Sequence, residues 1–303
     1  MSTAIVESVG PRRPRFRRYR FGKPAFLLQN RDREILRLVA EYRLVTSQEI
    51  QALITGSDQS ILRRLNILFH HAYLDRPQSQ KERGNAKFVY TLGRAGAQEI
   101  GWTAHQTDTR DWAERNRDLQ LRYIEHGLMI SRLHAALMLA TRADGRVMVE
   151  RWAQGKSLRD EVVIPHSDWK ERIPVCPDAY FALRLTDQKE GHNRIHVFVE
   201  ADRSTMTVSR FAVKMRGYWH YWRSGRQEKR FGFRNFLVLT VTVSTERATN
   251  LAKAAHVIDA PKHRGLRMFL FGCEKGYSVS EPSPVLEAIW RTPCDGRLHS
   301  ILE

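Results

Sequence analysis

Residues 233–244 (FRNFLVLTVTVS) form a continuous apolar run, which constrains the fold more than any other part of the chain. A strand with one exposed face alternates apolar and polar residues, so an unbroken run indicates a strand buried on both faces of a sheet. Shorter strand patterns and two helical patterns share this half of the chain, which makes it an α/β or α+β domain. The strand patterns lie at residues 147–153, 173–185, 194–201 and 266–272, and the helical patterns at 205–225 and 246–258.

The charge balance points to a polyanionic partner. The chain has 303 residues and carries a net charge of +17 with a pI of about 10.2. That length corresponds to about two domains, and such a basic excess indicates nucleic acid. An anionic membrane surface is disfavoured because no basic amphipathic helix with a Trp/Phe/Leu face stands alone, and no stretch approaches the roughly 20 apolar residues of a membrane-spanning helix. We therefore expect a double-stranded-DNA-binding protein that does not contact membranes.

Export signals and metal-binding cysteine patterns are both missing from the sequence. The N-terminus lacks an apolar segment with a small-residue cleavage site, so we expect a cytoplasmic protein. Cys176, Cys273 and Cys294 are widely spaced and form no Cys-x-x-Cys pair, so neither a zinc site nor a disulfide framework is predicted. His192 and His196 bracket a polar loop, and this spacing is more typical of an incidental pair than of zinc ligands.

The first hundred residues show three helical patterns followed by a hairpin pattern. The helices are expected at residues 31–43, 46–54 and 58–73, and Thr46 with Glu49 forms a capping box at the start of the second. Two short runs of strand-forming residues, 73–76 and 87–92, enclose a polar tip. Three short helices and a two-stranded wing predict a winged helix-turn-helix domain over residues 25–102.

In that geometry the third helix enters the major groove by its N-terminal residues, and the wing contacts phosphates. A basic, proline-flanked arm over residues 1–24 is expected to be disordered and to neutralise phosphates or reach into a minor groove. The alternatives are a winged helix used for protein contacts and an arm that only solubilises the chain. The expected DNA-binding residues are Arg12, Arg13, Arg15, Arg17 and Arg18 on the arm, Gln59, Ser60, Arg63 and Arg64 on the helix, and Lys81, Arg83 and Lys87 at the wing.

Residues 103–118 are polar and are expected to form a linker. Residues 119–142 form a long helical pattern that is apolar around much of its girth, so the helix packs in a core or against a partner chain. We expect a homodimer to form through this helix. Glu125 and His126 lie near its middle, where a single histidine is more often hydrogen-bonded structure than a metal ligand.

Three carboxylates are expected to meet at the end of the sheet. Asp178, preceded by proline, opens one strand, and Glu200 and Asp202 close the next. Alternate residues of a strand share a face, so Glu200 and Asp202 lie together, and a hairpin pairing brings Asp178 near both. Carboxylates held this close repel one another unless a cation separates them, and Mg²⁺ is the natural candidate. Such an ion activates water and stabilises the charge of phosphodiester cleavage.

This pattern resembles the PD-(D/E)XK nucleases, in which a Pro-Asp is followed on the next strand by an acidic-x-Lys motif. Here Asp202 stands where the motif has lysine. Lys214, on the following helix with Arg210 and Tyr218 four residues to either side, could supply the missing ammonium. The alternative is that the acids sit in surface turns or pair with Arg203 and Arg210.

The order of motifs along residues 30–292 resembles the replication-relaxation family of bacterial plasmid and mobile-element proteins. The motifs are the winged helix, the helix with Glu125-His126, IPVCPDAYFAL, FVEADRST, the helix with Lys214 and Tyr218, FLVLTVTVSTERATNL, and a late LEAIW. The resemblance implies a role in plasmid replication and relaxation of plasmid DNA. That family usually has Gly-Thr after its Glu-x-Asp, where this chain has Ser204-Thr205.

The expected fold class is thus α+β, with a winged helix-turn-helix followed by an α/β restriction-endonuclease-like domain over residues 119–303. Two functions remain open. In one, the protein is a DNA-binding replication or regulatory factor whose nuclease-like domain is a scaffold. In the other, it is a Mg²⁺-dependent endonuclease or nickase that uses Asp178, Glu200 and Asp202, with Lys214 assisting. The sequence contains no GxSxG, P-loop or GxGxxG motif that would support a serine hydrolase or a nucleotide-driven motor.

Overall fold

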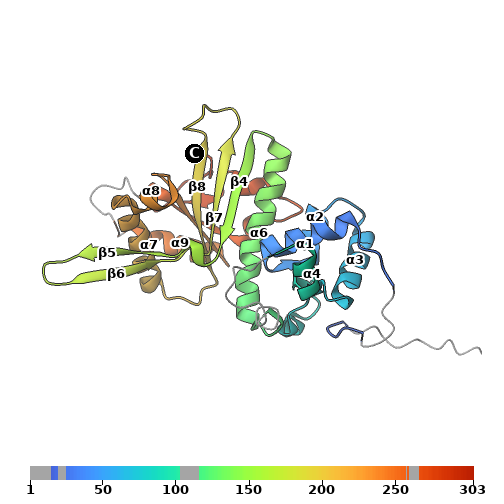
Figure 1. Cartoon of the computed structure of the whole chain (residues 1–303). Helices are drawn as coiled ribbons and strands as arrows, with labels where there is room; N and C mark the ends of the chain where they lie inside the picture. The colour runs from blue at the N-terminus through green and yellow to red at the C-terminus, as the bar shows by residue number, and fades with distance from the viewer. Residues whose placement is uncertain (1–14, 20–24, 103–115, 257, 259–265) are drawn as a thin grey trace, which may run out of the picture. The chain divides into compact units, whose positions relative to one another are not determined.

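A computed structural model describes residues 15–19, 25–102, 116–256, 258 and 266–303 of the chain (Figure 1). The chain divides into two compact units, Met1–Ile124 and Glu125–Glu303, called unit 1 and unit 2 below. Helices and strands are mixed throughout, and unit 2 contains a large sheet with both parallel and antiparallel pairs. The α+β class expected from the sequence is therefore confirmed.

Unit 1 consists of short helices around a three-stranded antiparallel sheet with the order β1-β3-β2. The three predicted helices and the predicted hairpin are all present, whereas the two-residue strand β1 was not predicted. The tip between the hairpin strands holds a short 3-10 helix, η1. The elements are α1 (Asn30–Tyr42), β1 (Val45–Thr46), α2 (Ser47–Leu53), α3 (Asp58–His70), β2 (Leu74–Asp75), η1 (Gln78–Arg83), β3 (Val89–Leu92) and α4 (Arg94–Glu99).

Local sequence explains where these helices begin and which faces they bury. The capping box at α2 is formed as predicted, because the Thr46 amide donates to Glu49 Oε2 at 2.7 Å and the Glu49 amide donates to Thr46 Oγ1 at 3.4 Å. Ser57 caps α3 by accepting from the Ser60 amide. The predicted apolar stripes form the core of unit 1, in which the buried side chains include Ile35, Leu36, Val39, Ile50, Leu53, Ile61, Leu65 and Leu68.

Unit 2 is built on a seven-stranded sheet with the order β12-β11-β10-β9-β8-β7-β4. The central strands β8, β9 and β10 run parallel, and the strands outside them pair antiparallel. The continuous apolar run becomes β9, whose residues are buried on both faces of the sheet apart from half-buried Leu237, as its sequence predicts, and it lies between β8 and β10. The strands are β4 (Val147–Gln154), β7 (Ala179–Leu185), β8 (Arg194–Asp202), β9 (Leu237–Thr242), β10 (Phe269–Cys273), β11 (Trp290–Arg291) and β12 (Leu298–His299).

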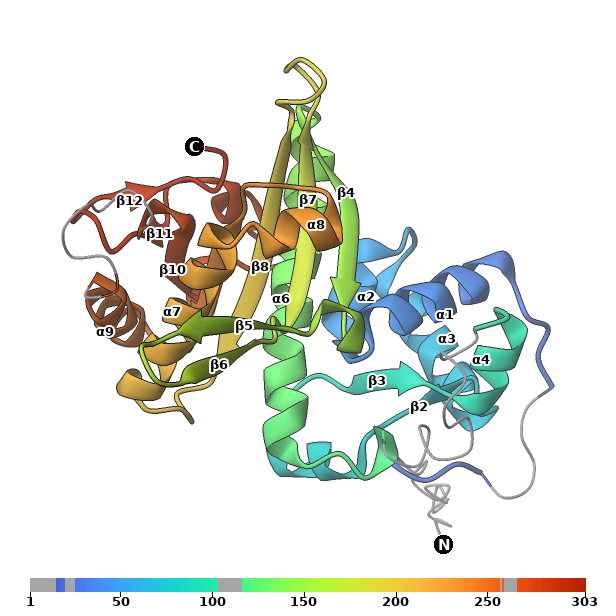
Figure 2. The same ribbon diagram turned by 60° about the vertical axis from the view of Figure 1, so that its left-hand side comes forward.

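Helices cover both faces of this sheet, as Figures 1 and 2 show. The helix α6 (Leu121–Asp144) packs on one face, where Phe181, Val199 and Leu239 point towards it. On the other face, α7 (Val208–Arg223) and α9 (Thr245–His256) pack against Phe198 and Val238. The short helix α8 (Arg226–Phe231) follows α7.

A two-stranded antiparallel ribbon, β5 (Asp160–Pro165) with β6 (Lys170–Val175), stands apart from the main sheet (Figure 2). The strand pattern at 173–185 is divided between β6 and β7, and Asp178, which was expected to open a strand, directly precedes β7. Gly217 lets α7 approach this ribbon closely, since a Cβ there would lie 2.7 Å from Ile173 Cγ2.

The long helix α6 buries apolar side chains against the sheet of its own chain, among them Met129, Leu133 and Leu137. Part of its apolar surface is thus buried within the chain itself, and a homodimer through this helix remains a prediction. None of the helices in the described part of the chain combines the length and apolarity needed to cross a membrane. The three cysteines, all in the described part of the chain, form no disulfide and are half-buried.

Candidate functional site

The N-terminal part of α3 presents polar side chains to solvent. Gln59 and Arg63 are exposed, and neither makes a hydrogen bond or ion pair with another described residue. Ser60 is half-buried, and its hydroxyl accepts from Arg31 Nη1 at 3.3 Å. Of the four residues expected to read DNA, Gln59 and Arg63 are therefore available to a ligand without breaking any of these contacts.

Arg64 is largely buried and contacts other residues of unit 1. Its Nε lies 2.8 Å from Asp32 Oδ1, its Nη2 bonds to Asp32 Oδ2, and it also donates to the Leu27 carbonyl at 3.1 Å. Asp32 is fully buried and the Arg64 side chain is only 12% exposed. Arg64 thus joins α3 to α1, and a base contact by Arg64 would break this buried pair; its contact with DNA remains a prediction.

The predicted phosphate contacts at the wing differ in availability. Lys81 and Lys87 are exposed, and the Lys81 ammonium lies 5.3 Å from the centre of the Phe16 ring. Arg83 is half-buried and donates to the Lys87 carbonyl at 3.1 Å. Lys81 and Lys87 can thus bind phosphates at little cost to the fold.

The described part of the basic arm contacts the helices and strands of unit 1. Arg12 and Arg13 lie outside the described residues, and Arg15 and Arg17 are exposed. Arg18 donates to the carbonyls of Phe69 (2.9 Å) and Leu74 (3.1 Å) and pairs with Asp75. The Arg18 guanidinium is thus bound to backbone oxygens of α3 and β2, and DNA contact by the arm remains a prediction.

In unit 2, the sheet brings Asp178 and Glu200 together. Asp178 directly precedes β7, whose first residue, Ala179, pairs with Val199 on β8. The Asp178 amide donates to the Val199 carbonyl, and its Oδ2 accepts from the Ala201 amide, both at 2.9 Å. The hairpin expected from the sequence thus forms and places Asp178 beside the strand that carries Glu200.

Glu200 is the centre of a buried polar cluster. The ammonium of Lys214 pairs with its Oε2, and the hydroxyl of Tyr218 donates to its Oε1; both side chains come from α7, one helical turn apart. Burial raises the pKa of Glu200 to about 7, against the opposing charge of Lys214. A carboxyl group with a pKa this close to neutrality is suited to gaining and losing protons, which is typical of functional sites.

His126, from α6, completes the cluster on the side of Asp178. Its Nε2 lies 3.4 Å from Asp178 Oδ2. The hydrogen bond to Asp178 raises the pKa of His126 despite partial burial. Burial tends to raise the pKa of Asp178, but His126 and Lys214 outweigh this effect and the pKa is lowered. The cluster of Glu200, Lys214, Tyr218, Asp178 and His126 is called the Glu200 cluster below.

Asp202 shares the sheet face of Glu200, as strand alternation predicts, but it has its own partners. Arg247, from the first turn of α9, approaches Asp202 through Nε (2.8 Å to Oδ2) and Nη2 (3.2 Å to Oδ1). Thr242 donates a third hydrogen bond to Asp202 at 3.1 Å, and Arg247 also donates to the Met206 carbonyl at 2.6 Å. Asp202 therefore anchors α9 and the segment before α7 to the sheet.

The three carboxylates each have a separate partner in this arrangement, and the magnesium site expected from the sequence remains a prediction. Asp178, Glu200 and Asp202 each contact a different basic residue, namely His126, Lys214 and Arg247. Within the described ranges, no three His, Cys, Asp or Glu side chains are grouped so that they could hold a metal ion. Neither Arg203 nor Arg210, the arginines proposed as alternative partners, pairs with the three acids in the described structure.

Sequence reasoning missed two features beside this cluster. Arg247 was not recognised as the partner of Asp202, although an arginine in the first turn of the helix after the central strand was the available signal. A second network joins Glu274 to Arg132 at 2.6 Å and to Arg203 at 3.3 Å, and Arg203 lies 3.8 Å from Glu125. Glu274 follows β10 and is separated from Arg132 by more than 140 residues, so no local sequence pattern predicts this ion pair.

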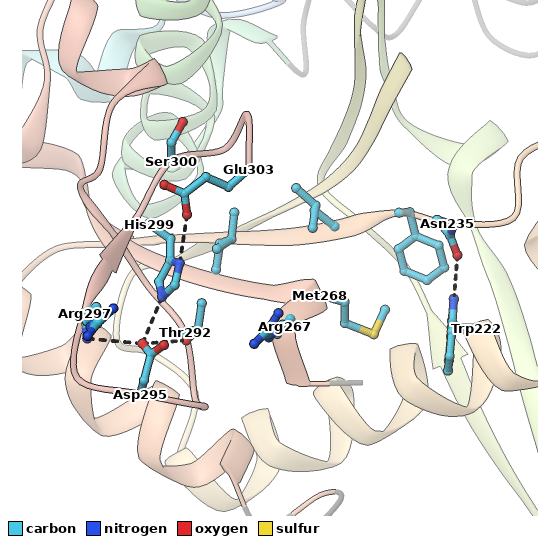
Figure 3. A pocket seen from close by; sticks show the side chains of 13 residues that line it. Trp222, Asn235, Arg267, Met268, Thr292, Asp295, Arg297, His299, Ser300 and Glu303 are labelled. Carbon is cyan, nitrogen blue, oxygen red and sulfur yellow. Dashed lines mark hydrogen bonds and ion pairs between the residues drawn. The ribbon is translucent and has the colours of Figure 1, made fainter. Parts of the chain in front are cut away.

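The hollow in Figure 3 is separate from the Glu200 cluster, none of whose residues lines it. It has a volume of about 510 Å³. His299 lies between two carboxylates there, 2.9 Å from Asp295 and 3.0 Å from Glu303. Arg267 and Arg297 lie at the same hollow and are exposed.

Comparison with known proteins identifies the family of this chain. No curated protein and no solved structure gives a significant match to the chain. The sequence model of the replication-relaxation family matches residues 36–237, which include α3, the wing, Asp178 and the whole Glu200 cluster. The match spans two thirds of the chain, and the chain belongs to the replication-relaxation family.

Proposed function

We propose that this protein binds double-stranded DNA through unit 1 and acts in the replication or relaxation of a plasmid or mobile element. The order α1-β1-α2-α3-β2-β3 and the sheet order β1-β3-β2 are those of a winged helix, which supports the DNA-binding assignment. Family membership supports the biological setting.

The observation that carries the proposal is the exposed polar face of α3 beside a basic wing. Gln59 and Arg63 have no partner among the described residues, and Lys81 and Lys87 project from the wing. A helix entering the major groove offers amide and guanidinium groups to base edges. Exposed lysines supply phosphate contacts that position the helix without selecting a sequence.

The experiment is a measurement of duplex affinity at several salt concentrations with the full chain. Each neutralised phosphate contributes about −0.9 to the slope of log K against log salt, so a slope of roughly −3 or steeper is expected for this surface. A variant with Lys81→Ala and Lys87→Ala should flatten the slope by about 1.8 for all sequences alike. Duplex affinity with no salt dependence would contradict the proposal.

A second candidate is cleavage of DNA at the Glu200 cluster, in a unit 2 of restriction-endonuclease-like architecture. The pKa of Glu200 near 7 and the adjacent Lys214 favour it, because Lys214 occupies the role that the nuclease motif gives to a lysine on the strand. It would require Asp178 and Glu200 to exchange their cationic partners for Mg²⁺. Incubation of supercoiled plasmid with the protein and Mg²⁺ or Mn²⁺ separates the two: nicking abolished by Asp178→Ala supports the enzyme, and intact plasmid supports the scaffold.

A further inference from the structure

A hollow of about 700 Å³ lies on unit 2 between strands β4, β7 and β8 and the segment that follows α8. Three arginines line it, Arg151, Arg194 and Arg234. Glu150, the only carboxylate among the described residues that line it, is bound to Arg194 at 2.6 and 2.8 Å. Arg234 is 77% exposed, with Glu228 at 3.8 Å as its nearest ion-pair partner. The hollow therefore keeps an excess of positive charge at Arg151 and Arg234.

The same hollow has an aromatic wall of nearly parallel rings. His196 stacks on Phe233 with centroids 4.1 Å apart and an interplanar angle of 9°, and Phe231 lies 5.8 Å from Phe233 at 11°. Tyr180 is 5.6 Å from Phe233 at 5°. Of these rings, His196 and Phe231 are half-buried and so are accessible to a ligand in the hollow.

The histidine of this wall is held as a flat, neutral surface. The Tyr180 hydroxyl and His196 Nδ1 lie 2.7 Å apart, which fixes the orientation of the imidazole. Burial lowers the pKa of His196, as does the charge of Arg194, so the ring is neutral at physiological pH. Its face is thus a stacking surface, and the positive charge of the hollow comes from the arginines.

We propose that this hollow binds nucleotides of single-stranded DNA, with a base against the aromatic wall and the flanking phosphates on Arg151 and Arg234. In a duplex the base faces are covered by their neighbours, so only an unstacked base can reach the wall. Aromatic rings combined with a cationic groove are the arrangement by which proteins hold single strands without reading their sequence. The size of the hollow is that of a small-ligand site.

This inference depends on the proposed function in one respect, namely that the polyanion bound by the protein is DNA. The hollow lies on unit 2, whereas the proposed duplex contacts lie on unit 1. With duplex contacts on unit 1 and a single-strand contact on unit 2, one chain could engage both states of DNA. Replication and relaxation both expose single strands, so such a contact suits the family to which the chain belongs.

The test compares a labelled oligothymidylate with a duplex of the same length, using the full chain. The double variant Arg151→Ala/Arg234→Ala should weaken single-strand binding about tenfold or more and flatten its salt slope by about 1.4, since each phosphate contact on a single strand contributes about 0.7. The matched control, Arg267→Ala/Arg297→Ala, removes the same charge from exposed arginines elsewhere on unit 2 and should change single-strand affinity less than about threefold.

Phe231→Leu tests the wall separately from the charge. It should weaken oligothymidylate binding with an unchanged salt slope, because no phosphate contact is lost. The inference is overturned if Arg151→Ala/Arg234→Ala and the control Arg267→Ala/Arg297→Ala lower the affinity for oligothymidylate equally. It is also overturned if thymidine monophosphate displaces the labelled oligothymidylate as effectively as the same concentration of unlabelled oligothymidylate does. Failure of duplex binding alone would overturn the proposed function and leave this inference standing, because the two are read from separate ligands.

Discussion

The outer face of α3 and the Glu200 cluster use charged residues in opposite ways. On α3, Arg63 is exposed and has no partner among the described residues. In the Glu200 cluster, Glu200 is 2% exposed, and each of its oxygens is bound by a side chain of α7. An exposed charge contributes little to stability and is available to a partner, whereas a buried charge is costly unless it stays paired. Substitutions should therefore separate the two regions, with loss of affinity in one and loss of stability in the other.

The largest effect is expected from Glu200→Ala. The substitution leaves the Lys214 ammonium and the buried Tyr218 hydroxyl without their carboxylate, and breaking such a pair costs about 3–5 kcal/mol of unfolding free energy. Urea unfolding measures this loss. The control is the double variant Glu200→Gln/Lys214→Met, which removes both charges and should cost clearly less. A loss of unfolding free energy below about 1 kcal/mol for Glu200→Ala would show that Glu200 is exposed to solvent. Its charge would then be no different from the exposed charges of α3.

Arg64→Ala should have the next largest effect, and it sharpens the comparison within one helix. The substitution leaves Asp32 fully buried, with the Gln29 amide as its remaining donor at 2.7 Å, and should destabilise unit 1 by about 2–3 kcal/mol. The neighbouring Arg63→Ala is a matched control, because it removes the same side chain from the exposed face and should cost less than about 0.5 kcal/mol. Equal losses in urea unfolding would refute the division between these two arginines.

Arg63→Ala should instead lower DNA affinity. A guanidinium that makes a bidentate contact to guanine is worth about 1–3 kcal/mol of discrimination against the wrong base. The measurement is the ratio of affinities for the best duplex from a selection experiment and for a random duplex. Lys81→Ala is the control, since loss of a phosphate contact should lower both affinities and leave their ratio unchanged. If the wing variant alone erased the ratio, our orientation of α3 in the groove would be wrong.

Adjacent α3 residues also show what sequence periodicity can and cannot predict. The stripe of Ile61, Leu65 and Leu68 fixed which face of the helix is buried, and Arg63 and Arg64 both point away from that stripe. Only the fold reveals that Asp32, on another helix, lies within reach of Arg64. Periodicity predicts burial within an element, whereas an ion pair between elements depends on how the elements pack.

The same limit applies to the acids of unit 2. Pairing of β7 with β8 followed from the sequence, so Asp178 and Glu200 could be placed together in advance. Arg247 could not be assigned to Asp202, because α9 reaches that edge of the sheet only through the parallel pairing of β8 with β9. One carboxylate that was expected at a metal is thus a structural anchor, while Lys214 lies at Glu200, where a migrated lysine was expected.

A smaller effect is expected at Ser204, which lies just after β8. Its φ of 59° is in the left-handed region, where a side chain costs about 1 kcal/mol and glycine does not. This explains why glycine suits position 204, where the family usually has the glycine of its Gly-Thr pair. Ser204→Gly should raise the free energy of unfolding by up to about 1 kcal/mol. Ser224→Gly, at a right-handed φ of −74°, is the control and should give no gain; a gain there equal to that at Ser204 would contradict the argument.

The smallest effect is a dependence on pH within the Glu200 cluster. The pKa of His126 is raised by its hydrogen bond to Asp178, so its contribution to stability is fully present below the unfolded value of about 6.5 and is lost as pH rises through the folded pKa. The pKa of Asp178 is lowered, so its contribution is lost as pH falls through the folded pKa. The cost of His126→Gln should therefore be largest in a window below pH 6.5 and should shrink on either side.

Because His126 is half-exposed, solvent screens this pair and the effect should stay small. Urea unfolding of His126→Gln at intervals from pH 4 to pH 9 measures it. Asp178→Asn removes the other member of the pair, but the charge of Asp178 also helps to raise the pKa of Glu200, so that variant should in addition lower the pKa of Glu200 and its profile should differ from that of His126→Gln near pH 7. A cost of His126→Gln that is equal at pH 6 and pH 9 would show that the imidazole contributes by packing and not by charge, and would leave Lys214 as the cation that holds both acids of the cluster.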